Sequence, residues 1–132
     1  YGHIGTQVGV LAEGLGMQVI YYDIVTKLAL GNARPAPDLA SLLEAADIIT
    51  LHVPETPQTQ NMIGAREIAR MKRGVRLINA ARGTVVDIDA LVGGLRSGQV
   101  GGAALDVFPY EPKNAQEEFV SPLREFDNVL LT

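Results

Sequence analysis

The apolar and polar positions of the chain predict helices and strands in alternation. Between residues 4 and 15 the apolar side chains recur at i, i+4, i+7 and i+11, which places them on one face of a helix, and Gly16 can end that helix. Asp38 and Asp87 can each cap a helix start, because a carboxylate accepts hydrogen bonds from free backbone N–H groups. The predicted helices are residues 4–15, 39–46, 65–71 and 87–96.

Short apolar, β-prone runs separate these helices and are typical of buried strands. The predicted strands are residues 17–22, 47–53, 75–79, 102–107 and 128–131, with loops at 24–37 and 108–127. Because the strands are apolar on both faces, the predicted fold class is α/β, a Rossmann-type doubly wound parallel sheet with helices on both sides. Gly93 and Gly94 lie inside the last helix, where each costs roughly 1 kcal/mol relative to alanine, so packing must hold it.

Composition narrows the class of protein. The 132 residues, 47% hydrophobic and 20% charged, suffice for one domain but not for a cofactor domain together with a substrate domain. A net charge of −4 predicts no nucleic-acid partner, and no apolar run approaches the roughly 20 residues that span a bilayer. The sequence has no cysteine, which excludes a disulfide or thiolate metal site and fits a cytoplasmic protein. The two histidines lack metal-ligand spacing.

A glycine turn opens directly into the first predicted helix. Gly2 and Gly5 match the second and third glycines of the dinucleotide-binding pattern G-x-G-x-x-G, whose first glycine would precede Tyr1. In that pattern Gly2 admits the pyrophosphate, Gly5 allows the helix to pack on its strand, and the N–H groups near His3 and Ile4 hold the phosphates. Taken alone, this partial motif fits an ordinary glycine turn equally well.

Asp23 strengthens the dinucleotide interpretation. It ends the next predicted strand at the position where a carboxylate binds the adenosine ribose hydroxyls, although a strand-end turn residue is the alternative. A carboxylate there also repels the additional phosphate of NADP, so the predicted cofactor is NAD. The strand that should precede the glycine turn is absent from the sequence. Since that strand is central in the order 3-2-1-4-5-6, we expect the strands at 17–22 and 48–53 to lose their neighbour at 75–79.

Arg82 follows the strand at residues 75–79 and therefore lies at the carboxyl edge of the predicted sheet, where such folds bind ligands. The planar guanidinium suits a substrate carboxylate, which it can hold through two parallel hydrogen bonds. By position alone, a surface arginine that caps a turn is an equally good interpretation.

Two longer runs resemble signatures of the D-2-hydroxyacid dehydrogenases. They are Asn79–Asp87, which contains the Ala-Arg-Gly-Thr sequence, and Gly102–Pro112, which contains Asp-Val-Phe followed by Glu-Pro. Residues 2–6, 51–54 and 121–132 are similar to the branch of that family that oxidises 3-phospho-D-glycerate to 3-phosphohydroxypyruvate in serine biosynthesis. The resemblance covers essentially the whole chain.

The resemblance implies a role for each candidate residue. It implies cofactor contacts by Gly2, His3, Ile4, Gly5, Asp23, Ala80, Ala81, Arg82 and Asp106. It also implies that Arg82 orients the substrate, and that Glu111 pairs with a catalytic histidine that takes the hydroxyl proton. The resemblance places that histidine just after Thr132, outside this chain. His3 and His52 are poor substitutes for it, so we expect the chain alone to be inactive.

The resemblance further implies a small-molecule 2-hydroxy acid as substrate, and a homo-oligomer, a dimer or tetramer, in the full-length protein. Residues 1–132 would form part of the NAD-binding domain, with the substrate-binding domain and any regulatory domain outside this chain. Two alternatives stay open. One is a dehydrogenase for another D-2-hydroxy acid such as D-lactate, and the other is a non-catalytic, NAD-sensing protein of the corepressor type.

Overall fold

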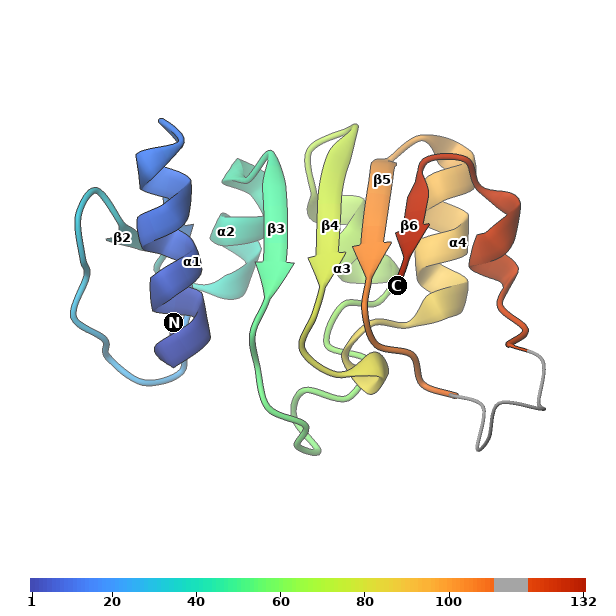
Figure 1. The fold of residues 1–132 in the computed structure, drawn as a ribbon, viewed down its shortest axis with the longest axis horizontal. Coiled ribbons are helices and arrows are strands. Elements are labelled where there is room, and N and C mark those ends of the chain that lie inside the picture. Colours follow the sequence, from blue (N-terminus) through green and yellow to red (C-terminus); the bar gives the residue numbers. More distant parts are fainter. Residues whose placement is uncertain (111–118) are drawn as a thin grey trace.

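The computed structural model describes residues 1–110 and 119–132. Its centre is a parallel four-stranded sheet in the order β3-β4-β5-β6, and a separate parallel pair, β1-β2, lies beside it (Figure 1). The strands are β1 (Ile20–Tyr21), β2 (Arg34–Pro35), β3 (Ile48–Leu51), β4 (Val75–Asn79), β5 (Val100–Leu105) and β6 (Val129–Leu131). The helices are α1 (His3–Gly14), α2 (Leu39–Ala45), α3 (Ala65–Arg70) and α4 (Ile88–Ser97), with two 3-10 turns, η1 (Gly83–Val85) and η2 (Pro122–Glu125).

The helix boundaries follow the capping signals in the sequence. The Asp38 carboxylate accepts a hydrogen bond from the Ser41 N–H at 2.7 Å and so starts α2. Asp87 starts α4 in the same way, through the Ala90 N–H at 3.1 Å. Gly98 ends α4 in the left-handed conformation, with φ of 72°, which glycine adopts without strain. All four predicted helices are present.

The predicted strand at residues 17–22 forms over only two residues, because it has a partner only there. The partner is β2, which lies inside the segment predicted as a loop, so that prediction was wrong at this point. The N–H groups of Arg34 and Ala36 donate to carbonyl oxygens of the β1 segment at 3.0 Å and 2.7 Å. The ladder therefore skips Pro35, which has no N–H to donate, and a proline can occupy the strand.

The strand order also differs from the prediction. β3 pairs directly with β4, in parallel register from Ile48↔Arg76 to Leu51↔Asn79, so the expected loss of this pairing was wrong. The prediction counted β3 as the third strand of the doubly wound order, but β2 holds that place next to β1. The β1-β2 pair alone is separate from the main sheet.

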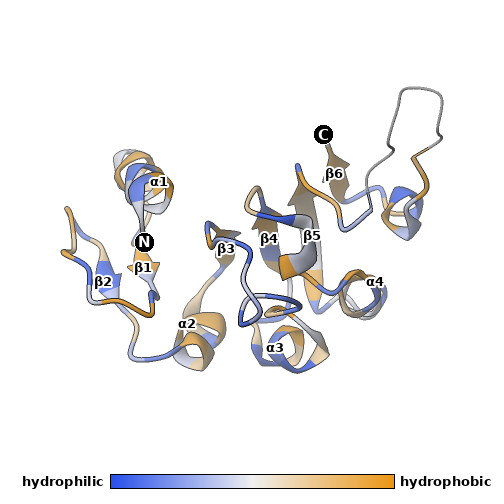
Figure 2. Cartoon of the chain, turned by 90° about the horizontal axis from the view of Figure 1, so that it is seen from below, coloured by the Kyte–Doolittle hydropathy of each residue, from blue (hydrophilic) through white to orange (hydrophobic). Residues whose placement is uncertain are grey.

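Helices cover one face of the main sheet, and the hydrophobic core lies between these helices and the sheet. Figure 2 shows α2, α3 and α4 along this face, with α3 between the other two. The completely buried side chains come from the helices, from the strands and from the segments that connect them. They include Leu43, Ile63, Val75, Leu77, Leu91, Val100 and Leu123. No helix in the described part of the chain is long and apolar enough to cross a bilayer.

The other face of the sheet is open in the described residues, where the sequence predicted helices on both sides. Only α1 lies on that side, next to β1 rather than over the four-stranded sheet (Figure 2). As a result, Ile78 and Leu130 on the sheet are exposed, and so are Ile4 and Leu11 on the predicted apolar face of α1. Parallel sheets in proteins are generally covered on both faces, so this exposed apolar surface is unusual for a parallel sheet.

The glycine pair in α4 allows helix propensity and packing to be tested separately. A Cβ on Gly93 would meet nothing within 4 Å, whereas one on Gly94 would lie 2.9 Å from Ile68 Cγ2 and 3.0 Å from Val100 Cγ2. We expect Gly93→Ala to raise the free energy of unfolding by about 1 kcal/mol. We expect Gly94→Ala to lower it by about 1 kcal/mol or more, because α4 must move away from α3 and β5. Urea denaturation measures both, and equal midpoints for the two variants would contradict this packing.

Candidate functional site

The predicted site residues after β4 and β5 lie together at the carboxyl edge of the sheet, the lower edge in Figure 1. The Asp106 N–H donates to the Asn79 carbonyl at 3.0 Å, which joins the ends of the two strands. The Asp106 carboxylate accepts a hydrogen bond from the Thr132 hydroxyl at 2.7 Å, just beyond β6. Arg82 follows β4 at the same edge. Open α/β sheets bind ligands in the crevice at this edge.

A buried asparagine shapes the turn that carries Arg82. The Asn79 side chain, only 1% exposed, accepts a hydrogen bond from the Ala81 N–H at 3.1 Å and donates to the Arg82 carbonyl at 3.0 Å. The turn at Ala80, Ala81 and Arg82 is therefore closed by a side chain from inside the sheet. Sequence reasoning missed this role of Asn79. The available signal was a single amide side chain at the end of an otherwise apolar strand, where burial requires hydrogen-bond partners.

A depression of about 330 Å³ lies beside this turn. It is lined by Glu55, Arg82, Gly83, Thr84, Val107, Phe108 and Pro109. Residues from the loops after β3, β4 and β5 thus meet around it. The Thr84 hydroxyl donates to the Glu55 carboxylate at 3.1 Å and ties η1 to the loop after β3. A guanidinium at the rim of such a depression can bind a small carboxylate.

The glycine turn and Asp23 form a second group, at the end of β1. Gly2 is the N-cap of α1, and no side chain caps the helix start in the described structure. The first N–H groups of α1, at His3 and Ile4, have no intrahelical partner. A Cβ on Gly2 would meet nothing within 4 Å, so the backbone there is open to a ligand. The Tyr1 nitrogen lies 2.7 Å from Asp23 Oδ2, which brings the start of the turn to the carboxylate.

Gly5 lies beside His52 in the structure. A Cβ on Gly5 would lie 3.7 Å from the His52 ring, an ordinary contact, and the predicted packing of α1 on its preceding strand stays a prediction. His52 follows β3, and its Nε2 lies 3.0 Å from the Thr50 hydroxyl. Burial lowers the pKa of His52 and favours the neutral ring. These contacts fit a packing role for His52.

Two neighbours of Asp23 favour its ionised form. Burial raises the pKa of Asp23, whereas the hydrogen bond from the Val25 N–H, at 2.9 Å, and the charge of Lys27, whose Nζ lies 4.0 Å from Oδ2, lower it. A carboxylate of this kind is a hydrogen-bond acceptor only, as a sugar hydroxyl requires.

The two groups suit an elongated ligand. Asp23 and the glycine turn lie at the end of β1, while Arg82 and Asp106 lie at the ends of β4 and β5, along one edge of the molecule (Figure 1). Glu111, the second predicted catalytic residue, lies outside the described residues. Among the described residues no cluster of histidine, aspartate and glutamate could hold a metal ion.

Comparison with known proteins shows the family to which the chain belongs. D-3-phosphoglycerate dehydrogenases from Escherichia coli strain K12 and Haemophilus influenzae are 61% and 58% identical to the chain over all 132 residues. The chain spans only 32% of each of these relatives, about a third of their length. The crystal structure of D-lactate dehydrogenase with NAD+ from Lactobacillus jensenii is 34% identical, with a TM-score of 0.90 over 99% of this chain and 42% of that one. Residues 1–132 match the family described as D-isomer specific 2-hydroxyacid dehydrogenase, NAD binding domain. The chain belongs to this family.

Proposed function

We propose that the chain is the NAD-binding part of a dehydrogenase that oxidises 3-phospho-D-glycerate to 3-phosphohydroxypyruvate. The observation that carries this proposal is the placement of Arg82 and Asp106 along the same edge of the molecule as Asp23 and the open glycine turn (Figure 1). The substrate is supported by the relatives named D-3-phosphoglycerate dehydrogenase, which match the chain from end to end. Such an enzyme would serve serine biosynthesis in the cytoplasm.

The described residues fit a dinucleotide. The open backbone at Gly2 and the free N–H groups at His3 and Ile4 would hold the pyrophosphate, with Gly5 in the same turn. The Asp23 carboxylate would accept hydrogen bonds from the adenosine ribose. At the other end, Ala80, Ala81 and Asp106 would contact the nicotinamide. NAD, when bound, supplies the hydride acceptor.

Side chains at the carboxyl edge of the sheet would bind the substrate and carry out the proton transfer. Arg82 would hold the substrate carboxylate and carbonyl oxygen, with its turn kept in place by Asn79. We propose that Glu111 pairs with a histidine outside this chain and raises its pKa, so that the histidine takes the hydroxyl proton near neutral pH. We also propose a homo-oligomer, a dimer or tetramer, as the form of the full-length enzyme.

A second candidate substrate has one observation in its favour. The matching solved structure with a TM-score of 0.90 is that of a D-lactate dehydrogenase. Arg82 recognises a carboxylate and would serve either acid, because both carry a carboxylate next to the carbon that is oxidised. Identity over the chain is 61% with the E. coli phosphoglycerate enzyme and 34% with the lactate enzyme, which favours the phosphorylated acid.

The test is NADH formation by the full-length protein, followed at 340 nm, with 3-phospho-D-glycerate, D-lactate and D-glycerate compared at equal concentration. We expect turnover that is selective for the phosphorylated acid. Turnover of D-lactate instead would establish the second candidate. NAD binding without turnover of any acid would overturn the enzymatic proposal in favour of a non-catalytic, NAD-sensing protein.

A further inference from the structure

A lysine lies next to the carboxylate that selects the cofactor. Lys27 Nζ is 4.0 Å from Asp23 Oδ2, and the two residues are four apart in a loop rather than on a helix. The Lys27 side chain is 35% exposed and that of Asp23 is 17% exposed. The ammonium group can therefore reach a ligand that binds to Asp23.

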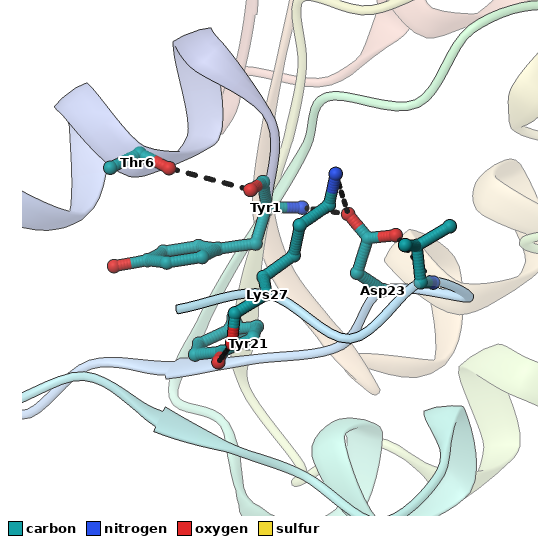
Figure 3. Close-up of polar contacts among 6 residues, drawn as sticks. Tyr1, Thr6, Tyr21, Asp23 and Lys27 are labelled. Atoms are coloured by element: carbon teal, nitrogen blue, oxygen red, sulfur yellow. Dashed lines mark hydrogen bonds and ion pairs between the residues drawn. The ribbon is translucent and has the colours of Figure 1, made fainter. Parts of the chain in front are cut away.

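The fold holds this lysine in place through its backbone. The Val25 N–H donates to Asp23 Oδ1 at 2.9 Å, which turns the chain back immediately after the carboxylate. The Tyr21 hydroxyl donates to the Lys27 carbonyl at 3.0 Å and fixes the far side of the same turn. Figure 3 shows the Lys27 side chain extending from this point toward Asp23.

The same turn is joined to the glycine turn. The Tyr1 and Tyr21 rings stack with centroids 3.8 Å apart and 11° between their planes, and the Thr6 hydroxyl donates to the Tyr1 carbonyl (Figure 3). Asp23 and Lys27 are therefore connected to the start of α1 through the two tyrosines. A dinucleotide that binds there would place its adenosine ribose beside both an anion and a cation.

These charges have opposite effects on a phosphate at the ribose 2′ position. Asp23 alone repels the 2′-phosphate of NADP, whereas an ammonium group about 4 Å away offsets much of that field. We propose that Lys27 is a second determinant of cofactor specificity, which moderates the exclusion of NADP by Asp23 and binds the 2′-phosphate when Asp23 is neutralised. This inference rests on the proposed binding of a nicotinamide dinucleotide.

The experiment measures dissociation constants of the full-length protein for NAD+ and NADP+ by calorimetry. The proteins compared are the wild type, Lys27→Ala, Asp23→Asn, and the double variant. We expect Lys27→Ala to weaken NADP+ binding about fivefold, which corresponds to one partly exposed charge contact, and to leave NAD+ binding nearly unchanged. Asp23→Asn should tighten NADP+ binding about tenfold or more, and the double variant should lose most of that gain.

Lys72→Ala is the matched control, because it removes the same charge from an exposed ion pair with Asp47, at 2.9 Å and away from this turn. It should leave both constants unchanged. Lys27→Arg should keep the NADP+ affinity, and the effect of Lys27→Ala should shrink in high salt, since exposed charges are screened.

Three results would overturn the inference, and they are distinguishable. If NAD+ binds but NADP+ affinity is the same with and without Lys27 in both backgrounds, only the role of Lys27 fails. If Lys72→Ala weakens NADP+ binding as much as Lys27→Ala, the effect is that of net charge and the site assignment fails. If the wild type binds neither dinucleotide, the proposed function fails with it. If Asp23→Asn does not fold, Lys27→Glu replaces it and should weaken NADP+ binding beyond Lys27→Ala.

Discussion

In the full-length protein, Arg82→Ala is expected to lower kcat/KM for 3-phospho-D-glycerate by about 10²–10⁴-fold, while the affinity for NAD stays nearly unchanged. The magnitude follows from two charge-assisted hydrogen bonds to a carboxylate, worth about 1.5–3 kcal/mol each, at about 1.4 kcal/mol per factor of ten. NAD affinity should persist because Asn79 holds the backbone of this turn through two hydrogen bonds that do not involve the guanidinium. Steady-state kinetics and a separate NAD titration measure the two quantities.

Arg82→Lys is the control for charge alone. Lysine keeps the positive charge but loses the planar fork, so it should recover only part of the activity. In the structure one arm of the Arg82 guanidinium, Nη1, donates to the Ala81 carbonyl at 2.6 Å. The substrate carboxylate would therefore have to draw the side chain outward or use its other arm. If Arg82→Ala retained the full kcat/KM, Arg82 would have no catalytic role.

Features set by local chemistry could be predicted from the sequence. The strand at 75–79 has the predicted bounds, and both aspartate caps and the glycine that ends α4 behave as expected. Each of these depends on side chains within a few residues of one another. Their signals are therefore present in any short window of sequence.

The pairing of strands could not be predicted in the same way. β2 contains Pro35, which argues against a strand, and it forms because its neighbours Arg34 and Ala36 donate to the β1 segment. Because this short strand was not expected, the prediction counted β3 as the third strand of the doubly wound order and missed its direct pairing with β4. Hydrophobic periodicity specifies which residues are extended, but it carries no information about which strands are neighbours.

The candidate site shows the same difference between features that depend on chain order and features that depend on the folded structure. Arg82 and Asp106 were expected at one edge from their order along the chain, because residues that follow parallel strands meet at one sheet edge, and they follow β4 and β5 of the main sheet. Asp23 follows β1, in the separate pair. The contacts of Asn79 with its turn and of Lys27 with Asp23 depend on side-chain conformations that only the folded structure defines. The order of residues along the sequence therefore predicts which strand ends carry candidate site residues, but not the side-chain contacts that hold those residues in place.

Gly83 also helps to hold the site in place, and Gly83→Ala is expected to lower both the free energy of unfolding and the catalytic activity. A Cβ on Gly83 would overlap the Phe108 carbonyl group and lie 2.5 Å from the Pro109 nitrogen. These are backbone atoms, which cannot rotate away as a side chain can. We expect a loss of about 2–4 kcal/mol in the free energy of unfolding, at and above the upper end of the usual range of about 1–3 kcal/mol for overpacking, because the backbone cannot yield easily.

The loss of activity should exceed what partial unfolding explains, because Gly83 directly follows Arg82 and both line the same depression. Displacing η1 from the loop after β5 moves the guanidinium relative to Asp106, and a shift of about 1 Å at a reacting centre can cost on the order of 10²-fold. The measurements are urea denaturation and kcat/KM of the full-length protein. Gly93→Ala is the matched control, since the same methyl group enters open space there. If Gly83→Ala were as stable and active as Gly93→Ala, the two loops would not be in contact and the geometry assigned to this edge of the site would be wrong.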